Sequence, residues 1–175
     1  LILVDNGNTP DTLIDLYRVA QTDPRFILIT GHGNVGFARG CNLGAARAGG
    51  DYITLLNPDC LLEPGALRAL KQALHGIPNA MLAGPLLLNP DGTEQRGGRR
   101  ELLTPKTAAT ESLGLHRVLR RAKRLNHHET ATPEHITAVP AISGACMMLR
   151  RADWQLLGGL DEGYFLHVED LDLCW

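Results

Sequence analysis

The closing stretch of the chain, YFLHVEDLDLCW, places three acids, Glu169, Asp170 and Asp172, close to His167. Carboxylates in this pattern are typical of a general base, of a metal site, or of the first turn of a helix, where acids favour the positive end of the dipole. A lone histidine beside acids is more often a packed residue than a ligand. We therefore interpret His167 and Asp172 as structural, with Asp172 on an outer face, and leave the role of the other two acids open at this point.

Two further acids follow apolar runs that are typical of strands. Asp5 follows LILV, and Asp59 lies in LLNPDC, where Pro58 stiffens the turn that separates it from Asn57. In an open α/β sheet, ligands bind at the carboxyl ends of the strands. One carboxylate together with a diphosphate is a normal way to hold Mg²⁺ or Mn²⁺, although aspartate is also a common turn residue.

The elements that must position these acids alternate along the chain. Apolar runs predict strands at 1–4, 26–30, 51–57, 80–88 and 141–149, and helical periodicity predicts helices at 11–20, 37–48, 66–74 and 151–159. Asp11 or Thr12 is expected to cap the first helix, and Pro64 to lie in the first turn of the third. This alternation predicts an α/β layer fold with a mainly parallel sheet.

Residues 89–138 interrupt this alternation of strands and helices. They begin with an Asn-Pro-Asp-Gly turn at 89–92, and more than half of the Lys and Arg residues of the chain lie between Arg96 and Arg124. We interpret this part as a basic, partly helical excursion that is mobile. Its stretch HRVLRRAKR (116–124) is either a solvated basic face or a face toward phosphate or a membrane surface.

Composition narrows the class of protein. A chain of 175 residues with 44% hydrophobic content suits one domain with a sizeable core, and a net charge of −2 gives no indication of nucleic-acid binding. The four cysteines are scattered, which is typical of buried thiols in a reducing compartment. No apolar run approaches the roughly 20 residues that span a bilayer. The sequence opens inside an apolar strand without Met, so we expect a chain that is cut at both ends.

The Gly-rich turn of FILITGHGNVGFARG matches a dinucleotide-binding fingerprint through Gly31, Gly33 and Gly36. That fingerprint also needs an acid at the carboxyl end of the next strand, where it would meet the ribose. Asp51 lies about 20 residues further on but precedes its strand. A nicotinamide-dependent or flavin-dependent oxidoreductase is therefore a disfavoured alternative.

Taken together, several segments resemble one enzyme family. They are LILVDNGN, NVGFARGCNLGAARAGGDYITLLNPDCLLEPGAL, NPDGTEQRGGRR, ISGACMMLRRADWQLLGGLDE and FLHVEDLDLCW. In this order and at these distances they resemble the inverting family 2 glycosyltransferases, most of all the rhamnosyltransferase-like branch. The resemblance covers nearly the whole chain. It implies a GT-A type, Rossmann-like three-layer α/β fold with a mainly parallel central sheet, in one partial domain whose first strand is missing.

The resemblance also implies roles for individual residues. Asp5 matches the acid that binds the pyrimidine base of the donor, and Asp59 matches the metal-contacting acid of an Asp-x-Asp motif whose first position is Asn57. Glu169 and Asp170 match the paired catalytic acids near the acceptor, with Asp170 as the base and Glu169 as the acid that orients the base or meets the acceptor. Other matches lie beside the nucleotide, its phosphates or the donor sugar: Asn34, Gly36, Asn42 and Gly144.

Two positions depart from the family pattern. Asn57 replaces the first Asp of the motif, which implies a lower affinity for the metal. Cys41 stands where many members carry Arg, and Arg39 is the residue that would contact the phosphates instead. We interpret Trp154 and Trp175 as packing residues rather than as platforms for a sugar.

The resemblance implies an activity and its partners. We expect transfer of a sugar from a nucleotide-sugar donor, with dTDP-rhamnose suggested by the branch, to a saccharide or lipid-linked saccharide acceptor in cell-envelope polysaccharide or glycolipid synthesis. Mg²⁺ or Mn²⁺ is the expected cofactor, and the expected location is cytoplasmic, at the inner face of the membrane. The alternative is a truncated, non-catalytic module that binds nucleotide sugars.

Overall fold

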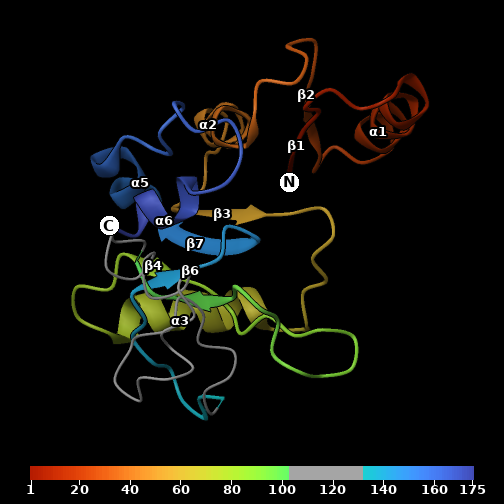
Figure 1. Ribbon diagram of the computed structural model, residues 1–175. Coiled ribbons are helices and arrows are strands. Elements are labelled where there is room, and N and C mark those ends of the chain that lie inside the picture. The colour runs from red at the N-terminus through yellow and green to blue at the C-terminus, as the bar shows by residue number, and fades with distance from the viewer. Residues whose placement is uncertain (103–131) are drawn as a thin grey trace, which may run out of the picture. The chain divides into compact units, whose positions relative to one another are not determined.

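The computed structural model describes residues 1–102 and 132–175 (Figure 1). The described chain divides into two compact units. The first consists of Leu1–Ile53 and Arg151–Glu169, and the second of Thr54–Arg150 and Asp170–Trp175. A single domain over 1–175 remains a prediction, and the basic stretch 116–124 lies outside the described residues.

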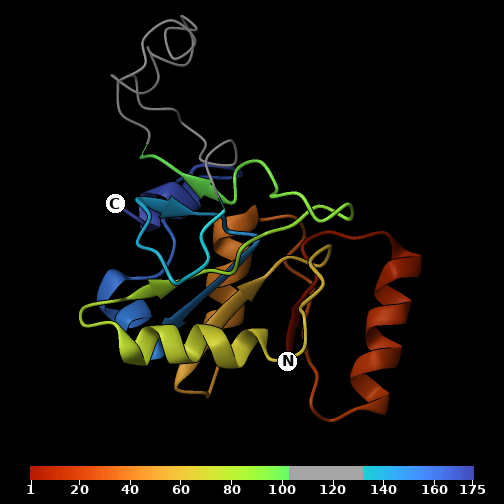
Figure 2. The same ribbon diagram turned by 90° about the horizontal axis from the view of Figure 1, so that it is seen from below.

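The first unit is built on a pair of parallel strands, β1 (Ile2–Val4) and β2 (Ile27–Ile29), with Leu3 opposite Leu28. Parallel strands need a crossover connection, and α1 (Pro10–Thr22) provides it. Helix α1 packs against β2, and α2 (Phe37–Ala46) packs against β1 from the other side of the pair (Figure 2). The unit also contains α5 (Arg151–Leu157), which buries Trp154 as expected.

The predicted cap of the first helix and the predicted place of Pro64 in the third are both wrong. Helix α1 is capped by Thr9, whose side chain accepts a hydrogen bond from the Thr12 backbone at 3.4 Å, and Pro10 takes the first helical position, where no amide donor is needed. Helix α3 (Ala66–Gly76) begins after Gly65, which has a φ of 90°. Pro64 therefore precedes this helix instead of lying in its first turn.

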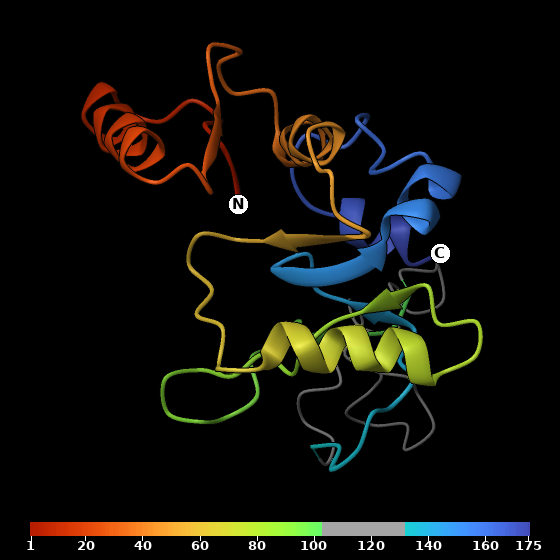
Figure 3. The same ribbon diagram turned by 180° about the vertical axis from the view of Figure 1, so that it is seen from behind.

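The second unit is built on a three-stranded sheet in the order β3 (Tyr52–Leu56), β7 (Cys146–Arg150), β4 (Leu82–Ala83). The first residues of β3 belong to the first unit. The α/β class is confirmed, but the expected parallel arrangement does not extend to β7, which pairs antiparallel with β4. Helix α3 packs along β4 and β7 (Figure 3).

Arg150, at the end of β7, joins this sheet to α3. Its guanidinium donates hydrogen bonds to the carbonyl oxygens of Leu74 and Ala80. The last carbonyls of a helix have no partner inside the helix. Arg150 therefore satisfies the end of α3 and fixes it against the strand.

Two predicted strands are shorter than the apolar runs suggested. Within 80–88 only Leu82 and Ala83 form a strand. The run 141–149 is two strands, because a turn at 143–145 separates β6 (Ala141–Ile142) from β7. Strand β6 pairs antiparallel with β5 (Arg99–Arg100), so one apolar run contributes to two sheets. The predicted turn at 89–92 is confirmed by a hydrogen bond from the Gly92 amide to the Asn89 carbonyl.

The largest fully buried side chains of the described residues are Leu74, Met147, Leu149 and Cys146, which all lie in the second unit. Strand β7 contributes three of them and is covered on both edges by β3 and β4. No helix among the described residues has the length and apolar character needed to cross a membrane.

Replacing Leu149 with Ala should lower the free energy of unfolding by about 2–5 kcal/mol, because the cavity would open in the most buried strand. The same truncation at Leu61, which is 98% exposed, should change it by about 0.5 kcal/mol or less. Urea unfolding of both variants measures the difference. Equal effects at the two positions would show that β7 is not the core strand.

Candidate functional site

The predicted site residues fall into both units. The first unit holds Asp5, Asn34, Gly36, Arg39, Asn42 and Glu169, and the second holds Asn57, Asp59, Gly144 and Asp170.

Asp5 lies at the carboxyl end of β1 and is only 6% exposed. One carboxylate oxygen accepts hydrogen bonds from the backbone and side-chain amides of Asn8, at 3.0 and 2.9 Å, and the other accepts one from the Thr30 hydroxyl at 2.7 Å. These bonds, with Thr30 the strongest cause, hold the pKa of Asp5 below its ordinary value of 3.8, and the nearby His32 acts in the same direction. The carboxylate is fixed in its ionised form beside the end of the strand.

The Gly-rich turn before α2 is held by Asn6, a residue to which the sequence analysis assigned no role. Its side chain accepts a hydrogen bond from the Val35 amide at 3.0 Å and donates one to the Gly36 carbonyl at 3.1 Å. Asn34 accepts a bond from the Gly36 amide at 3.1 Å. Two predicted nucleotide-flanking residues are thus brought together at the beginning of α2.

Gly36 is required by its surroundings. Its φ is 87°, and a Cβ atom there would lie 2.6 Å from the carbonyl oxygen of Phe165, which also accepts a hydrogen bond from Phe37. Any other residue would combine left-handed backbone strain with a collision. The third glycine of the fingerprint therefore has a packing role in this chain.

Asn42 has a structural role that the sequence did not indicate. Its side chain exchanges two hydrogen bonds with the backbone of Leu160 at 2.8 and 3.0 Å and donates a third to Glu162 at 3.0 Å. Glu162 also lies 3.7 Å from the exposed guanidinium of Arg39. These bonds tie α2 to the segment that follows α5, and the predicted contact of Asn42 and Arg39 with phosphate remains a prediction.

Asn57 and Asp59 lie in the turn that follows β3. The Asn57 amide donates to the Ala145 carbonyl at 2.9 Å, and the Asn57 carbonyl accepts from Cys60 at 3.1 Å, so the turn is closed and anchored. Asp59 is exposed, and its carboxylate accepts no hydrogen bond from the described residues. An accessible carboxylate on a fixed turn suits a hard divalent cation that keeps water and phosphate oxygens as its other ligands.

Asp170 lies in α6 (Glu169–Leu173) and is 8% exposed. One carboxylate oxygen accepts a hydrogen bond from the Leu171 amide at 2.8 Å. The other accepts one from the Gly144 amide at 2.8 Å and also pairs with Arg100. Gly144 and Asp170 were both predicted site residues, and the structure brings them into direct contact.

The dipeptide Gly144–Ala145 connects helix α6 with the turn that follows β3. The Gly144 amide binds the carboxylate of Asp170, and the Ala145 carbonyl binds the amide of Asn57. The predicted base and the turn that carries Asp59 are therefore attached to consecutive residues of one turn. A displacement of this dipeptide would move both.

The three acids of the closing stretch differ in how far they are buried. Glu169 and Asp170 are buried, so they are not a solvated helix start, whereas Asp172 is exposed as predicted. His167 is exposed and has a φ of 71°, and Val168 follows with a φ of 75°. Left-handed conformations are strained for a β-branched residue, so α6 is entered through a costly backbone conformation.

Three other predictions concern Trp175, a metal centre and the cysteines. Trp175 is exposed, so its predicted packing role is wrong for the described chain. Among residues 1–102 and 132–175, no three His, Cys, Asp or Glu side chains gather as a metal centre. The four cysteines are free, and burial raises the pKa of each thiol, that of Cys41 to about 12 with the charge of Glu169 adding to the effect.

Arg100 is a site residue that sequence reasoning missed. The segment NPDGTEQRGGRR was recognised as a unit, but none of its arginines was assigned a role. The signal was the arginine pair Arg99–Arg100, because successive residues of a strand face opposite sides and thus meet different partners.

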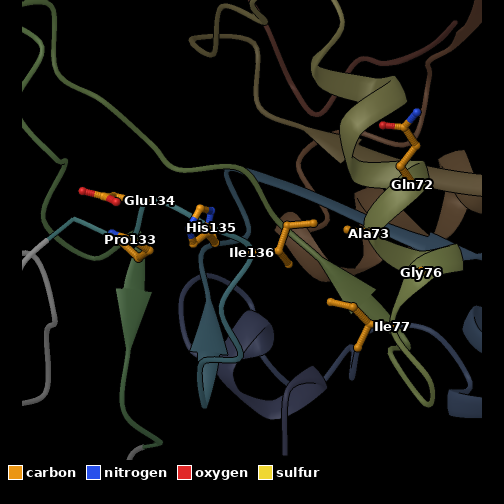
Figure 4. A pocket seen from close by; sticks show the side chains of 8 residues that line it. All are labelled: Gln72, Ala73, Gly76, Ile77, Pro133, Glu134, His135 and Ile136. Atoms are coloured by element: carbon orange, nitrogen blue, oxygen red, sulfur yellow. The ribbon is translucent and has the colours of Figure 1, made fainter.

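A cavity of about 660 Å³ lies between α3 and residues 133–136 (Figure 4). Its lining includes the apolar residues Ala73, Ile77 and Ile136 and the polar residues Gln72, Glu134 and His135. None of the predicted site residues lines it. This cavity is separate from the group formed by Asp170, Gly144 and Asn57.

The family model of glycosyl transferase family 2 matches residues 1–157, which is most of the chain. The chain belongs to glycosyl transferase family 2. This identification removes the dinucleotide-dependent oxidoreductase from consideration.

Curated relatives of this family 2 chain include two glycosyltransferases. An N-acetylglucosaminyl-diphospho-decaprenol L-rhamnosyltransferase of Mycobacterium tuberculosis is 30% identical over 192 aligned residues, which cover 99% of this chain and 59% of the relative. A low-salt glycan biosynthesis hexosyltransferase of Haloferax volcanii is 24% identical and is covered to 52% of its length. The chain therefore spans between half and two thirds of these relatives.

Solved structures support the GT-A fold. A mannosyltransferase from Pyrobaculum calidifontis in complex with GDP-Man and Mn²⁺ superposes with a TM-score of 0.61 at 19% identity, covering 98% of this chain and 40% of that one. GalNAc-T7 with UDP, GalNAc and Mn²⁺ gives a TM-score of 0.65 at 14% identity, with 99% and 33% covered. The predicted fold class of this family 2 chain is confirmed.

Replacing Thr30 with Val should destabilise the protein at pH 7, because it removes the strongest of the bonds that lower the pKa of Asp5. A lowered pKa contributes stability above the unfolded value of 3.8, and this contribution is lost as the pH falls through the folded value. The difference in unfolding free energy between wild type and variant should therefore shrink below pH 3.8.

Urea unfolding at pH 7 and at about pH 3 measures this change. Thr22→Val is the matched control, since its hydroxyl binds only backbone carbonyls of Arg18 and Val19. Its effect should not depend on pH. A Thr30→Val effect that stays constant between the two pH values would contradict the assignment.

Proposed function

We propose that this family 2 glycosyltransferase moves a sugar from a nucleotide-diphospho-sugar to an acceptor hydroxyl with inversion at the anomeric carbon. The observation that carries the proposal is the attachment of Asp170 and of the Asn57–Asp59 turn to the same dipeptide, Gly144–Ala145. A fixed carboxylate would serve proton transfer and an accessible one would serve a cation, which are the two groups that the proposed reaction needs.

The proposed reaction is a direct displacement. The acceptor hydroxyl gives its proton to the Asp170 carboxylate as its oxygen bonds to the anomeric carbon, and the bond to the diphosphate breaks with the electron pair leaving on the diphosphate. A hydroxyl is a poor nucleophile, so a positioned carboxylate contributes by removing the proton as the bond forms. Burial of Asp170 supports this role, because water competes less with the acceptor.

A divalent cation, Mg²⁺ or Mn²⁺, would supply charge neutralisation for the departing diphosphate. Asp59 would hold it, with Asn57 beside it on the same turn. The exposure of Asp59 and the absence of a hydrogen bond to its carboxylate from the described residues fit such a ligand. The Mn²⁺ in the two superposed structures agrees with the proposal.

The donor side belongs to the first unit. Asp5, held ionised by Thr30 and Asn8, would bind the base of the nucleotide, and the turn at Asn34 and Gly36 would lie along the nucleotide. We propose dTDP-rhamnose as the donor, supported by the rhamnosyltransferase relative.

The same relative supports a lipid-linked saccharide as acceptor, since its name includes a diphospho-decaprenol carrier. An acceptor of this kind is embedded in a membrane. We therefore propose that the protein works at the cytoplasmic face of a membrane, in peripheral contact with it, in the synthesis of a cell-envelope glycan.

Replacing Asp170 with Asn should lower turnover about 10²–10⁴-fold, because the amide cannot accept the proton of the acceptor. Donor binding, followed by calorimetry, should persist. The Asp172→Asn variant, altered at an exposed position two residues away, is the control and should retain full activity. Full turnover in a folded Asp170→Asn enzyme would exclude Asp170 as the base.

Replacing Asp59 with Ala should abolish the dependence of nucleotide affinity on Mn²⁺, because its carboxylate would be the protein ligand of the cation. Calorimetry with dTDP, with and without Mn²⁺, measures the dependence in wild type and variant. An unchanged dependence would place the metal elsewhere in the protein.

A further inference from the structure

The two arginines of β5 have separate partners. Arg99 makes two hydrogen bonds to the carboxylate of Glu94, both at 2.6 Å, in a largely buried ion pair. Arg100 faces the opposite side of the strand, as alternation requires. There its guanidinium donates to the Ile142 carbonyl at 3.1 Å and to the carboxylate of Asp170.

The surroundings of Arg100 make this ion pair more than a surface contact. Its side chain is 18% exposed, and that of Asp170 is 12% exposed. Among the described residues, Asp170 is the carboxylate that pairs with Arg100, and the buried Nε atom of Arg100 has no hydrogen-bond partner. A buried cation is costly without its counter-ion, so each of the two charges depends on the other.

The ion pair also fixes the orientation of the Asp170 carboxylate. The oxygen that meets Arg100 also accepts the Gly144 amide at 2.8 Å, while the second oxygen accepts the Leu171 amide at 2.8 Å. The two backbone amides hold the carboxylate from the turn and from the helix, and Arg100 holds it from β5. Rotation about the side-chain bonds of Asp170 would break at least one of these contacts.

We propose that Arg100 is a positioning residue that acts through Asp170, holding the carboxylate in the orientation that accepts the proton of the acceptor hydroxyl. This inference rests on the proposed function of Asp170 as the base. Arg100 touches neither donor nor acceptor in this proposal, so its loss should change the rate of the chemical step and leave substrate binding alone.

The Arg100→Gln variant of the complete protein tests the proposal. It should lower kcat about 10–10²-fold, because a small misplacement of a reacting group has an effect of this size, with the KM values for donor and acceptor unchanged. Arg100→Lys should recover part of the lost kcat, since it keeps the charge and donors that reach a carboxylate.

Arg99→Gln is the matched control. It removes an equally buried arginine from the same two-residue strand and breaks the pair with Glu94 instead. It should leave kcat close to that of wild type. Melting temperatures of all variants establish that they are folded, and an equal loss of kcat in the Arg99 and Arg100 variants would overturn the proposal.

A double-mutant cycle with Asp170→Asn separates positioning from a general structural effect. If Arg100 acts through Asp170, Arg100→Gln should cause little further loss in the Asp170→Asn background. The same fold loss in both backgrounds would overturn the inference, as would a normal kcat in Arg100→Gln. In either case a wild type that transfers sugar and an inactive Asp170→Asn would leave the proposed function intact, whereas a wild type without transfer would refute that function.

Discussion

The hydrogen bonds and the ion pair of the Asp170 carboxylate are the interactions that hold the second unit together around the candidate site. The carboxylate joins α6, the turn at Gly144 and strand β5 through bonds to Leu171, Gly144 and Arg100, and the last two lie 26 and 70 residues away in the sequence. A buried carboxylate must find donors or it opposes folding. The chain therefore brings three distant segments to one point, and that point is a fixed acceptor group.

The turn at 143–145 also lies where the predicted strand 141–149 is divided into two. The Gly144 amide donates to the side chain of Asp170 and not to a neighbouring strand, and the run 141–149 is interrupted at this turn. It divides into β6 and β7, which serve two different sheets. This interruption attaches the turn after β3 and helix α6 to consecutive residues, Ala145 and Gly144.

In the first unit, amide side chains join segments of the chain by hydrogen bonds. Asn6 and Asn34 fix the turn before α2, and Asn42 fixes α2 to the segment near Leu160. Short amide side chains hold turns because each offers a donor and an acceptor. Asn34 and Asn42, which the family resemblance assigns to the nucleotide side, thus also hold the local structure.

The sequence by itself determined the α/β class, the helices, most strands and the acids at strand ends, because periodicity and turn residues are local properties. The cap of α1 and the place of Pro64 before α3 were missed, although the cap at Thr9 is a local contact with Thr12. The division of 141–149 was missed because it involves Asp170, which is distant in the sequence. The sequence identified Asp170 but not the role of Arg100, because the arginine pair Arg99–Arg100 does not indicate which partner, 70 residues away, each arginine meets. The sequence placed Asp172 on an outer face, but only the tertiary structure showed that Glu169 and Asp170 are buried, and burial distinguishes a positioned carboxylate from a solvated one.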